Sequence, residues 1–299
     1  MWGTTYLAIR VGVRHIPPFA FAGIRYVVAG ALLYPFALRS ATKNETSPRS
    51  YDRRMRGRAW LACGVVGVFL LFGGNGGVTY AETMLPSGIS AVLVATVPIW
   101  MIAFSWPLLH RRVGPGAALG IAVGLGGVVL LTGNFAGTDR IEGILIVLGA
   151  AASWGFGSVV SHRLPLPRQT MLAAAMEMLV AGVVLLAVAA AVGEFSRFHL
   201  ASIPTTGWIA LAYLIGPGSI LAFSAYSYAL SRLAISTVST YAYVNPVVAV
   251  VAGIVVLGER LTLLEALGAV VVLISVLILL NRTGDDPESP RAESTKRQQ

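Results

Sequence analysis

The chain of 299 residues is 56% hydrophobic and only 12% charged, and its mean hydropathy is +0.75. Because soluble domains carry about 25% charged residues, this composition excludes an ordinary soluble domain and indicates a helical membrane protein. The net charge of +9 does not indicate a nucleic-acid partner, since the basic residues crowd into the 39–58 loop and the 282–299 tail. Cationic segments beside apolar spans instead follow the positive-inside rule.

Apolar stretches of roughly 20 residues recur along nearly the whole sequence and predict ten transmembrane helices. We expect these helices at residues 2–14, 17–38, 59–80, 88–109, 115–133, 142–161, 169–192, 206–230, 235–257 and 262–281. Lysines and arginines concentrate in the loops on the side that would hold both termini. We therefore expect a multi-pass protein of the cell (cytoplasmic) membrane with both termini in the cytoplasm.

The first of these ranges is short for a membrane span. Residues 2–14 reach about 20 Å at 1.5 Å per residue, whereas the hydrocarbon core is about 30 Å thick. The second half of the chain has additional helix-compatible residues, 143–153, before Trp154, and nothing corresponds to them before Trp2. We expect the first helix to be truncated, either because the natural start lies upstream of Met1 or because the chain is a shortened product.

The sequence repeats itself. Trp2-Gly3 returns as Trp154-Gly155, and Pro98 returns as Pro246 in an equivalent apolar range. Each copy holds five expected helices, so the second copy must enter the membrane from the opposite side. We predict an all-α membrane protein of two inverted five-helix repeats, which is typical of secondary transporters. The expected units are a first repeat at 1–133, a linker at 134–141, a second repeat at 142–281 and a polar cytoplasmic tail at 282–299.

Two ionisable residues lie deep in expected spans. They are Arg25 and, at the equivalent position of the second copy, Glu177. A lone charge at that depth costs on the order of 3 kcal/mol, so each side chain should face a partner or water. Both could make a structural contact or bind the transported solute, and Glu177 could also couple transport to protons. The sequence leaves these alternatives open.

Prolines and glycines interrupt several spans. Pro98 and Pro246 each remove a backbone donor near the middle of a span and predict paired bends, either hinges or rigid kinks. Gly216-Pro217-Gly218 interrupts another span of the second copy, and such broken spans are pointers to a transport site. A capping box from Thr262 to Glu265 is expected to open the last span.

Polar residues that could line a solute pathway lie beside these interruptions. Asn75 sits in the glycine-rich stretch 73–77, although that stretch could equally be a small-residue packing interface. Aromatic and amide side chains gather toward the end of the chain, just before Pro246, where anchoring at the membrane surface explains them poorly. Besides Asn75, we expect the pathway to be lined by Tyr80, Tyr228, Tyr241, Tyr243 and Asn245.

Catalytic signatures are missing from the sequence. It contains no phosphate-binding G-x-x-x-x-G-K-[ST] loop, no G-x-S-x-G elbow and no H-E-x-x-H motif. The single cysteine, Cys63, allows no disulfide within the chain. We predict no enzyme activity, no metal and no cofactor. The expected partners are a small-molecule substrate, the lipid bilayer and a proton as coupling ion, in a monomer or homodimer.

Several motifs resemble EamA-type members of the drug/metabolite transporter superfamily. They are Trp2-Gly3-Thr4-Thr5-Tyr6, Pro17-Pro18, Gly23-Ile24-Arg25-Tyr26, Asn245-Pro246-Val247 and Gly258-Glu259-Arg260-Leu261-Thr262. The similarity covers residues 1–281 as two tandem units. It implies a ten-helix bundle in a prokaryotic cytoplasmic membrane, with a central cavity and export of small solutes such as amino acids. The first copy departs at residues 111–114, and its first span is short.

Together these observations predict a secondary active transporter that exports small metabolites by alternating access. A passive channel or facilitator would share the same features and differ only in failing to accumulate solute against a gradient. A membrane-embedded lipid-handling protein would need a catalytic pair facing one leaflet, which the sequence does not display. A non-transporting scaffold would lack a polar internal cavity.

Overall fold

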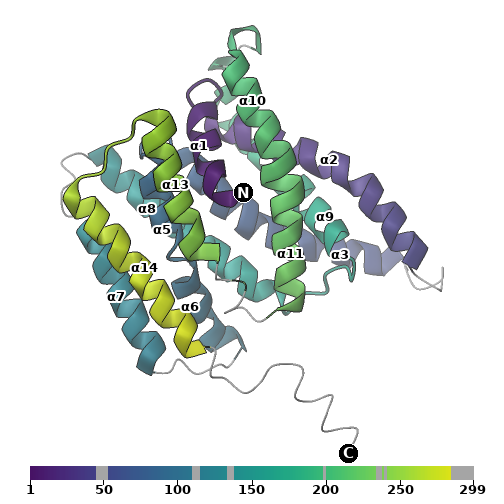
Figure 1. Ribbon diagram of the computed structural model, residues 1–299. Coiled ribbons are helices and arrows are strands. Elements are labelled where there is room, and N and C mark those ends of the chain that lie inside the picture. The colour runs from purple at the N-terminus through teal and green to yellow at the C-terminus, as the bar shows by residue number, and fades with distance from the viewer. Residues whose placement is uncertain are drawn as a thin grey trace, which may run out of the picture.

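The computed structural model of the protein describes residues 1–44, 53–109, 115–132, 138–197, 200–233, 238 and 241–283. The regular structure in these ranges is helical, without a strand (Figure 1). The helices are α1 (Trp2–Gly12), α2 (Pro18–Asn44), α3 (Arg53–Gly67), η1 (Val68–Gly76), α4 (Gly77–Ala81), α5 (Ser87–Val94), α6 (Val97–Leu109), α7 (Pro115–Thr132), α8 (Thr138–Ser161), α9 (Thr170–Ala191), η2 (Glu194–Arg197), η3 (Leu200–Ser202), α10 (Thr205–Tyr213), η4 (Leu214–Leu221), α11 (Ala222–Arg232), α13 (Tyr241–Leu257) and α14 (Leu263–Thr283). Residues 284–299 of the expected tail and residues 134–137 of the expected linker lie outside the described residues.

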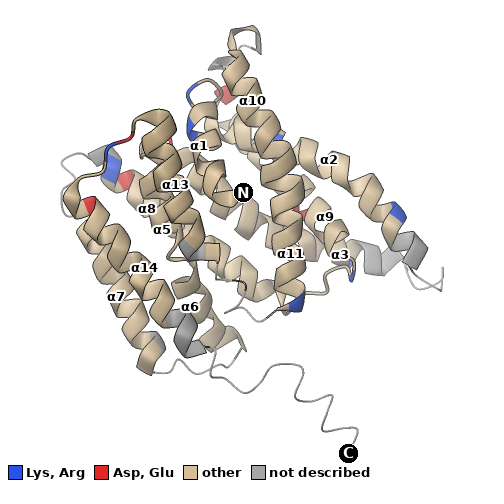
Figure 2. Ribbon diagram, in the orientation of Figure 1, with Lys and Arg blue, Asp and Glu red and all other residues tan. Residues whose placement is uncertain are grey.

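Six helical stretches in the described chain are long and apolar enough to cross a membrane. They are Pro18–Ser40, Gly57–Ala81, Ser87–Leu109, Arg140–Ser161, Thr170–Ala191 and Thr205–Arg232. Shorter apolar helices cover Ala118–Leu130, Val244–Leu257 and Leu263–Ile278. In the described part of the chain, charged residues lie mostly near helix ends, with long uncharged helical stretches between them (Figure 2). The protein is therefore a multi-pass membrane protein, while the ten-helix inverted topology stays a prediction.

Glycines allow helices of the two halves to approach closely. α2 packs along α9, and α7 packs along α14 (Figure 1). In the first pair, a Cβ at Gly30 would lie 2.8 Å from Leu179 Cγ, and one at Gly182 would lie 2.7 Å from the backbone nitrogen of Val27. In lipid there is no hydrophobic driving force between helices. Small residues at such crossings let the backbones approach closely, and the resulting van der Waals packing holds the helices together. The glycine of each repeated Val-Ala-Gly motif, Val28-Ala29-Gly30 and Val180-Ala181-Gly182, thus packs against the helix of the other half.

Two spans change helix type in their middle. η1 and η4 are π-helical segments inserted between α-helices, and they contain the glycine-rich stretches of the two halves. Short π-helical segments inside α-helices occur frequently at functional sites. A π-turn carries an extra residue, and glycines without side chains accommodate the altered register. In η1, for example, Gly73 and Gly74 lie directly against Ser153 and Trp154 of α8.

The two expected proline bends take different forms. α5 ends at Val94 and α6 begins at Val97, so the span around Pro98 is broken rather than continuously kinked. Pro98 falls in the first turn of α6, where a missing backbone donor costs nothing. Pro246 instead lies inside α13. The bends expected at the two prolines stay predictions.

The last helix begins as expected. The backbone nitrogen of Thr262 donates to Glu265 Oε2 at 2.6 Å, and the nitrogen of Glu265 donates to Thr262 Oγ1 at 3.3 Å. This reciprocal pair is the capping box expected from the sequence, which is confirmed. It satisfies two backbone donors that would otherwise be left unpaired at the start of α14.

Candidate solute pathway

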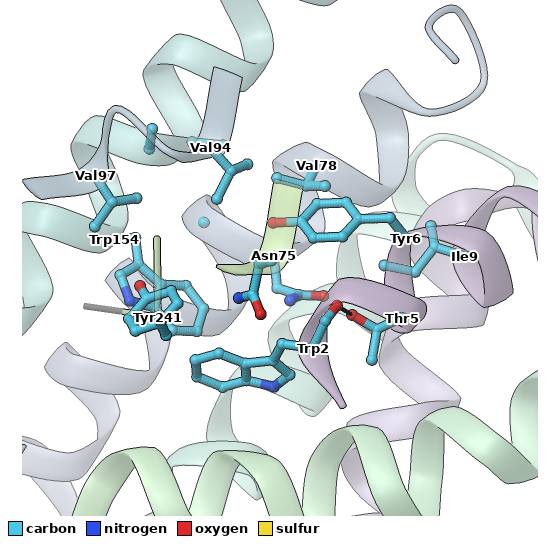
Figure 3. Close-up of a pocket in the computed structure, with 14 residues that line it drawn as sticks. Trp2, Thr5, Tyr6, Ile9, Asn75, Val78, Val94, Val97, Trp154 and Tyr241 are labelled. Atoms are coloured by element: carbon cyan, nitrogen blue, oxygen red, sulfur yellow. Dashed lines mark hydrogen bonds between the residues drawn. The ribbon is translucent and has the colours of Figure 1, made fainter. Parts of the chain in front are cut away.

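A central cavity lies where α1, η1, α8 and α13 meet. It holds about 40 Å³ of space for water-sized molecules and is lined mainly by apolar side chains, with two amides, a threonine and several aromatic rings. Asn75 and Trp2 point into this space, between Tyr6 on one side and Tyr241 on the other (Figure 3). The lining residues are Trp2, Thr5, Tyr6, Ile9, Gly74, Asn75, Val78, Val94, Val97, Ala150, Ala151, Trp154, Tyr241 and Asn245.

Trp2 is the centre of an aromatic cluster beside the cavity. Its ring centroid lies 5.6 Å from Trp154, 5.1 Å from Tyr226 and 5.2 Å from Tyr241. Edge-to-face pairs at such distances contribute about 0.5–1.5 kcal/mol each beyond their burial. The equivalent tryptophans of the two repeats are therefore in direct contact. Their shared Trp-Gly motif was visible in the sequence, but nothing there predicted that the two rings meet.

Trp154 belongs to a hydrogen-bonded group of three side chains. The indole Nε1 of Trp154 donates to the Tyr226 hydroxyl at 3.0 Å, and the Ser158 and Tyr226 hydroxyls lie 2.7 Å apart. Ser158 also donates to the backbone oxygen of Trp154 at 2.8 Å. All three side chains are buried. We call these three residues the Trp154–Tyr226–Ser158 cluster. Sequence reasoning did not select Tyr226, because nothing distinguished it from neighbouring tyrosines.

The side chain of Arg25 forms hydrogen bonds with both π-helical segments, η1 and η4. Its Nε donates to Ser219 Oγ at 2.7 Å, its Nη1 to Asn75 Oδ1 at 3.1 Å and its Nη2 to the Gly218 backbone oxygen at 3.3 Å. The guanidinium carbon lies 4.7 Å from the centroid of the Tyr26 ring. Arg25 is only 2% exposed. Hydrogen bonds from all three donor nitrogens offset part of the desolvation cost of this buried cation.

A second cavity lies between the ends of α8, α9 and α11. It holds about 470 Å³, and its lining is more polar than that of the central cavity. Glu177, which is 3% exposed, contributes to the lining from α9. The exposed residues His162, Arg168 and Arg232 line it as well. Glu177 therefore faces a polar cavity rather than Arg25, its repeat-equivalent residue.

The remaining expected pathway residues lie in different places. Asn245 lines the central cavity together with Asn75 and Tyr241. Tyr80 is half-buried and stacks on Phe19, with ring centroids 5.4 Å apart. Tyr228 is 55% exposed and outside the linings of both cavities. The side chain of Tyr243 lies outside the described part of the structure. The roles assigned to these residues stay predictions.

Glu259 connects the two halves at another helix end. Gly258 adopts a left-handed conformation with φ of +65°, and the backbone nitrogen of Glu259 donates to the Gly253 oxygen at 3.1 Å. This helix-ending motif favours glycine and directs Glu259 toward the start of α5. There its carboxylate accepts bonds from Ser87 N and Oγ at 2.9 Å and from Gly88 N at 3.2 Å.

Apolar helices that enclose internal cavities containing a few polar side chains are the arrangement of a multi-pass membrane transport protein. The chain belongs to the EamA-like transporter family, whose profile matches residues 1–133 and 141–281. It is thus a transporter of the drug/metabolite transporter superfamily, as the sequence motifs indicated.

Several bacterial proteins are similar over most of the chain. "Uncharacterized inner membrane transporter YedA" of Escherichia coli K12 is 39% identical over 283 residues, covering 93% of this chain and 87% of its own. The "Probable amino-acid metabolite efflux pump" of the same organism is 23% identical, covering 93% and 90%. A protein of known crystal structure matches 93% of this chain and 92% of its own at a TM-score of 0.65 and 21% identity, which shows a shared fold.

Proposed function

We propose that this protein is a secondary active transporter that exports small metabolites, such as amino acids or related compounds, by alternating access. The central cavity supports this proposal, because Trp2 and Trp154, the equivalent residues of the two halves, line it together with Asn75 and Asn245. Secondary transporters bind their substrates near the bilayer midplane, at the interface between their two halves. The relative named as an amino-acid metabolite efflux pump favours amino-acid-like cargo.

Reciprocal packing supports two inverted five-helix repeats. α1 packs on α10 and α13, and α8 packs on η1 and α6. In repeat order, these contacts join the first helix to the eighth and ninth spans, and the sixth helix to the third and fourth. A two-fold axis in the membrane plane would exchange one set of contacts for the other. The same axis would pair α2 with α9 and α7 with α14, and both pairs are in contact.

The two cavities follow one another along shared helices. On α8, Trp154 lines the central cavity and Ser161 lines the second cavity. On the adjoining span, Gly74 lines the central cavity and Leu70, one helical turn earlier, lines the second. The Trp154–Tyr226–Ser158 cluster lies between these levels on α8. We assign that cluster the role of the barrier that opens when solute passes from one cavity to the other.

We infer from the positive-inside rule that the second cavity opens toward the cytoplasm. The loop carrying Arg163 and Arg168 and the end of α11 carrying Arg232 would then face the cytoplasm. An exporter must accept its cargo from that side. A proton could be the coupling ion, with Glu177 as its acceptor, because a buried carboxylate in a span exchanges protons only where water reaches it.

A channel or facilitator is the alternative function. The central cavity of about 40 Å³ has room for a few water molecules at most. A continuously open pore would need a wider connection, so the constricted cavity favours a carrier. A lipid-handling protein is a weaker alternative, because the described cavities contain no pair of carboxylates.

Untargeted metabolite profiling tests the proposal. Cells that overproduce the protein should release a small set of metabolites into the medium faster than cells that lack it, and those metabolites should fall in cytoplasmic concentration. An overproducing strain with the substitution Asn75→Leu serves as the control for overproduction itself. Identical profiles in all three strains under varied nutrient conditions would argue against export.

A further inference from the structure

The second cavity has the size of a ligand site, whereas the central cavity does not. Sites for small molecules typically measure about 300–1,000 Å³. At about 470 Å³ the second cavity falls in this range, while the central cavity holds only about 40 Å³. In this conformation, therefore, a solute can be held beside α8, α9 and α11 but not between Trp2 and Asn75.

The floor of the second cavity carries an unusual carboxylate. Glu177 is 3% exposed and lines the cavity, and among the described residues it forms no hydrogen bond and no salt bridge. Its carboxylate faces the cavity, so only water or a ligand inside the cavity can be its partner there. A cationic ligand group that enters the cavity would supply the missing partner.

The rim of the cavity has the opposite charge. Arg168 and Arg232 are exposed and line the cavity, and the guanidinium carbon of Arg232 lies 5.5 Å from the centroid of the Tyr228 ring. Guanidinium groups bind carboxylates well, through paired hydrogen bonds. The rest of the lining mixes small polar side chains (Ser161, Thr170, Ser227 and Ser231) with aliphatic ones (Val66, Leu70, Leu164, Leu166, Ala173 and Leu230).

We propose that this cavity is a loading site for a small aliphatic zwitterion, whose ammonium group binds Glu177 and whose carboxylate binds Arg168 and Arg232. This inference rests on the proposed function, because it names a substrate class and a waiting position ahead of the central cavity. The aliphatic body packs against the aliphatic side chains of the lining. The Trp154–Tyr226–Ser158 cluster then separates the loaded solute from Asn75.

Binding to the purified full-length protein tests the inference without requiring transport. Three probes carry the same isobutyl side chain: L-leucine, the amine 3-methylbutylamine, which lacks the carboxylate, and the acid 4-methylpentanoate, which lacks the ammonium group. Isothermal titration calorimetry at neutral pH should give saturable leucine binding. The amine and the acid should each bind about tenfold more weakly or worse, because each lacks one charged contact.

Substitutions assign the two ends of the ligand. Glu177→Gln should weaken leucine and amine binding by about tenfold and leave acid binding unchanged. The pair Arg168→Gln and Arg232→Gln should weaken leucine and acid binding several-fold and leave amine binding unchanged. Glu142→Gln and Arg163→Gln, which alter exposed charges outside the cavity lining, should change nothing. Leucine binding that is absent, or that is equal in wild type and Glu177→Gln, would overturn the inference.

A position-specific measurement covers the case in which Glu177→Gln does not fold. In a Cys63→Ala background, Ser231→Cys introduces a thiol at the cavity lining, and Ser196→Cys introduces one at an exposed site on η2. Leucine should slow the reaction of the first thiol with a charged thiosulfonate reagent and leave the second unaffected. Equal reaction rates with and without leucine at Ser231→Cys would contradict the assignment.

These outcomes are distinguishable from failure of the transport proposal. If leucine binds with the expected charge dependence but no metabolite is exported from cells, the loading site stands and the transporter function falls. If export proceeds and Glu177→Gln leaves leucine binding intact, the function stands and the loading site falls.

Discussion

Arg25 donates a hydrogen bond from Nε to Ser219 Oγ at 2.7 Å, and this bond joins α2 of the first half to η4 of the second. The same guanidinium binds Asn75 in η1 at 3.1 Å. One side chain thus fixes both π-helical segments, and it also orients the amide that faces the central cavity. Because a planar guanidinium directs its donors in fixed directions, the relative position of the two segments depends on this residue.

Replacing Arg25 by lysine should destabilise the protein although the charge is kept. An ammonium group cannot reach Ser219, Asn75 and the Gly218 oxygen in the same geometry, so at least one buried partner loses its bond. The expected cost is about 1–3 kcal/mol. Thermal unfolding in detergent measures it. Arg14→Lys, at an exposed position, is the matched control, and equal unfolding temperatures for both variants would refute the structural role of Arg25.

Tyr226→Phe tests the Trp154–Tyr226–Ser158 cluster. The ring and its tilted and edge-on contacts with Trp2 and Trp154 would remain, but the indole N–H would lose its acceptor. We expect about 1–3 kcal/mol of destabilisation for the buried, unpaired donor. Tyr228→Phe removes a hydroxyl from an exposed ring on the same helix and should be neutral. Fluorescence-detected unfolding of the two variants compares them directly, and a neutral Tyr226→Phe would remove the cluster from the account.

Neighbouring glycines of α7 give a matched pair for the contact with α14. A Cβ at Gly127 would lie 2.8 Å from both the backbone nitrogen and Cγ2 of Val272, whereas a Cβ at Gly126 has nothing within 4 Å. Gly127→Ala should push the helices apart and cost about 1–3 kcal/mol. Gly126→Ala should be neutral or slightly stabilising. A shift of unfolding temperature in the opposite order would show that the two helices do not pack as described.

Glu259→Ala should weaken the contact between the end of α13 and the start of α5. The carboxylate accepts bonds from Ser87 and Gly88, and removing it leaves the first turn of α5 uncapped. Loss of a helix cap costs about 0.5–2 kcal/mol. Glu142→Ala, which removes an exposed carboxylate, provides the comparison. The unfolding temperature of the Glu259 variant should fall below that of the Glu142 variant; identical values would contradict the capping role.

The sequence predicted the class of protein because hydropathy and repeated motifs are local signals. It also indicated that Arg25 and Glu177 lie deep in their spans, where each should face a partner or water, since both fall inside apolar stretches. It could not predict that Arg25 binds Asn75 and Ser219, because those contacts depend on how three distant helices pack. The contacts of Trp154 and Tyr226 could not be predicted for the same reason, because they form only when the two halves come together.

Helix register explains why Tyr228, which was expected to line the pathway, lies outside both cavities. Tyr228 and Tyr226 are two positions apart on α11, and on a helix such neighbours point in different directions. Tyr226 therefore reaches the aromatic cluster while Tyr228 is exposed. The exact register near a π-helical segment is not readable from sequence, because the inserted residue rotates everything that follows it. The residue type alone could not show which of these two tyrosines is buried.

Uphill accumulation in everted membrane vesicles is the most direct test of the central claim that solute passes through the cavity at Asn75 by coupled, alternating access. With a proton gradient and the radiolabelled metabolite identified by profiling, wild-type vesicles should concentrate it above the external level, and a protonophore should abolish the difference. Asn75→Leu vesicles with equal protein content should not concentrate it. Mere equilibration in wild-type vesicles, or undiminished accumulation with Asn75→Leu, would contradict the account.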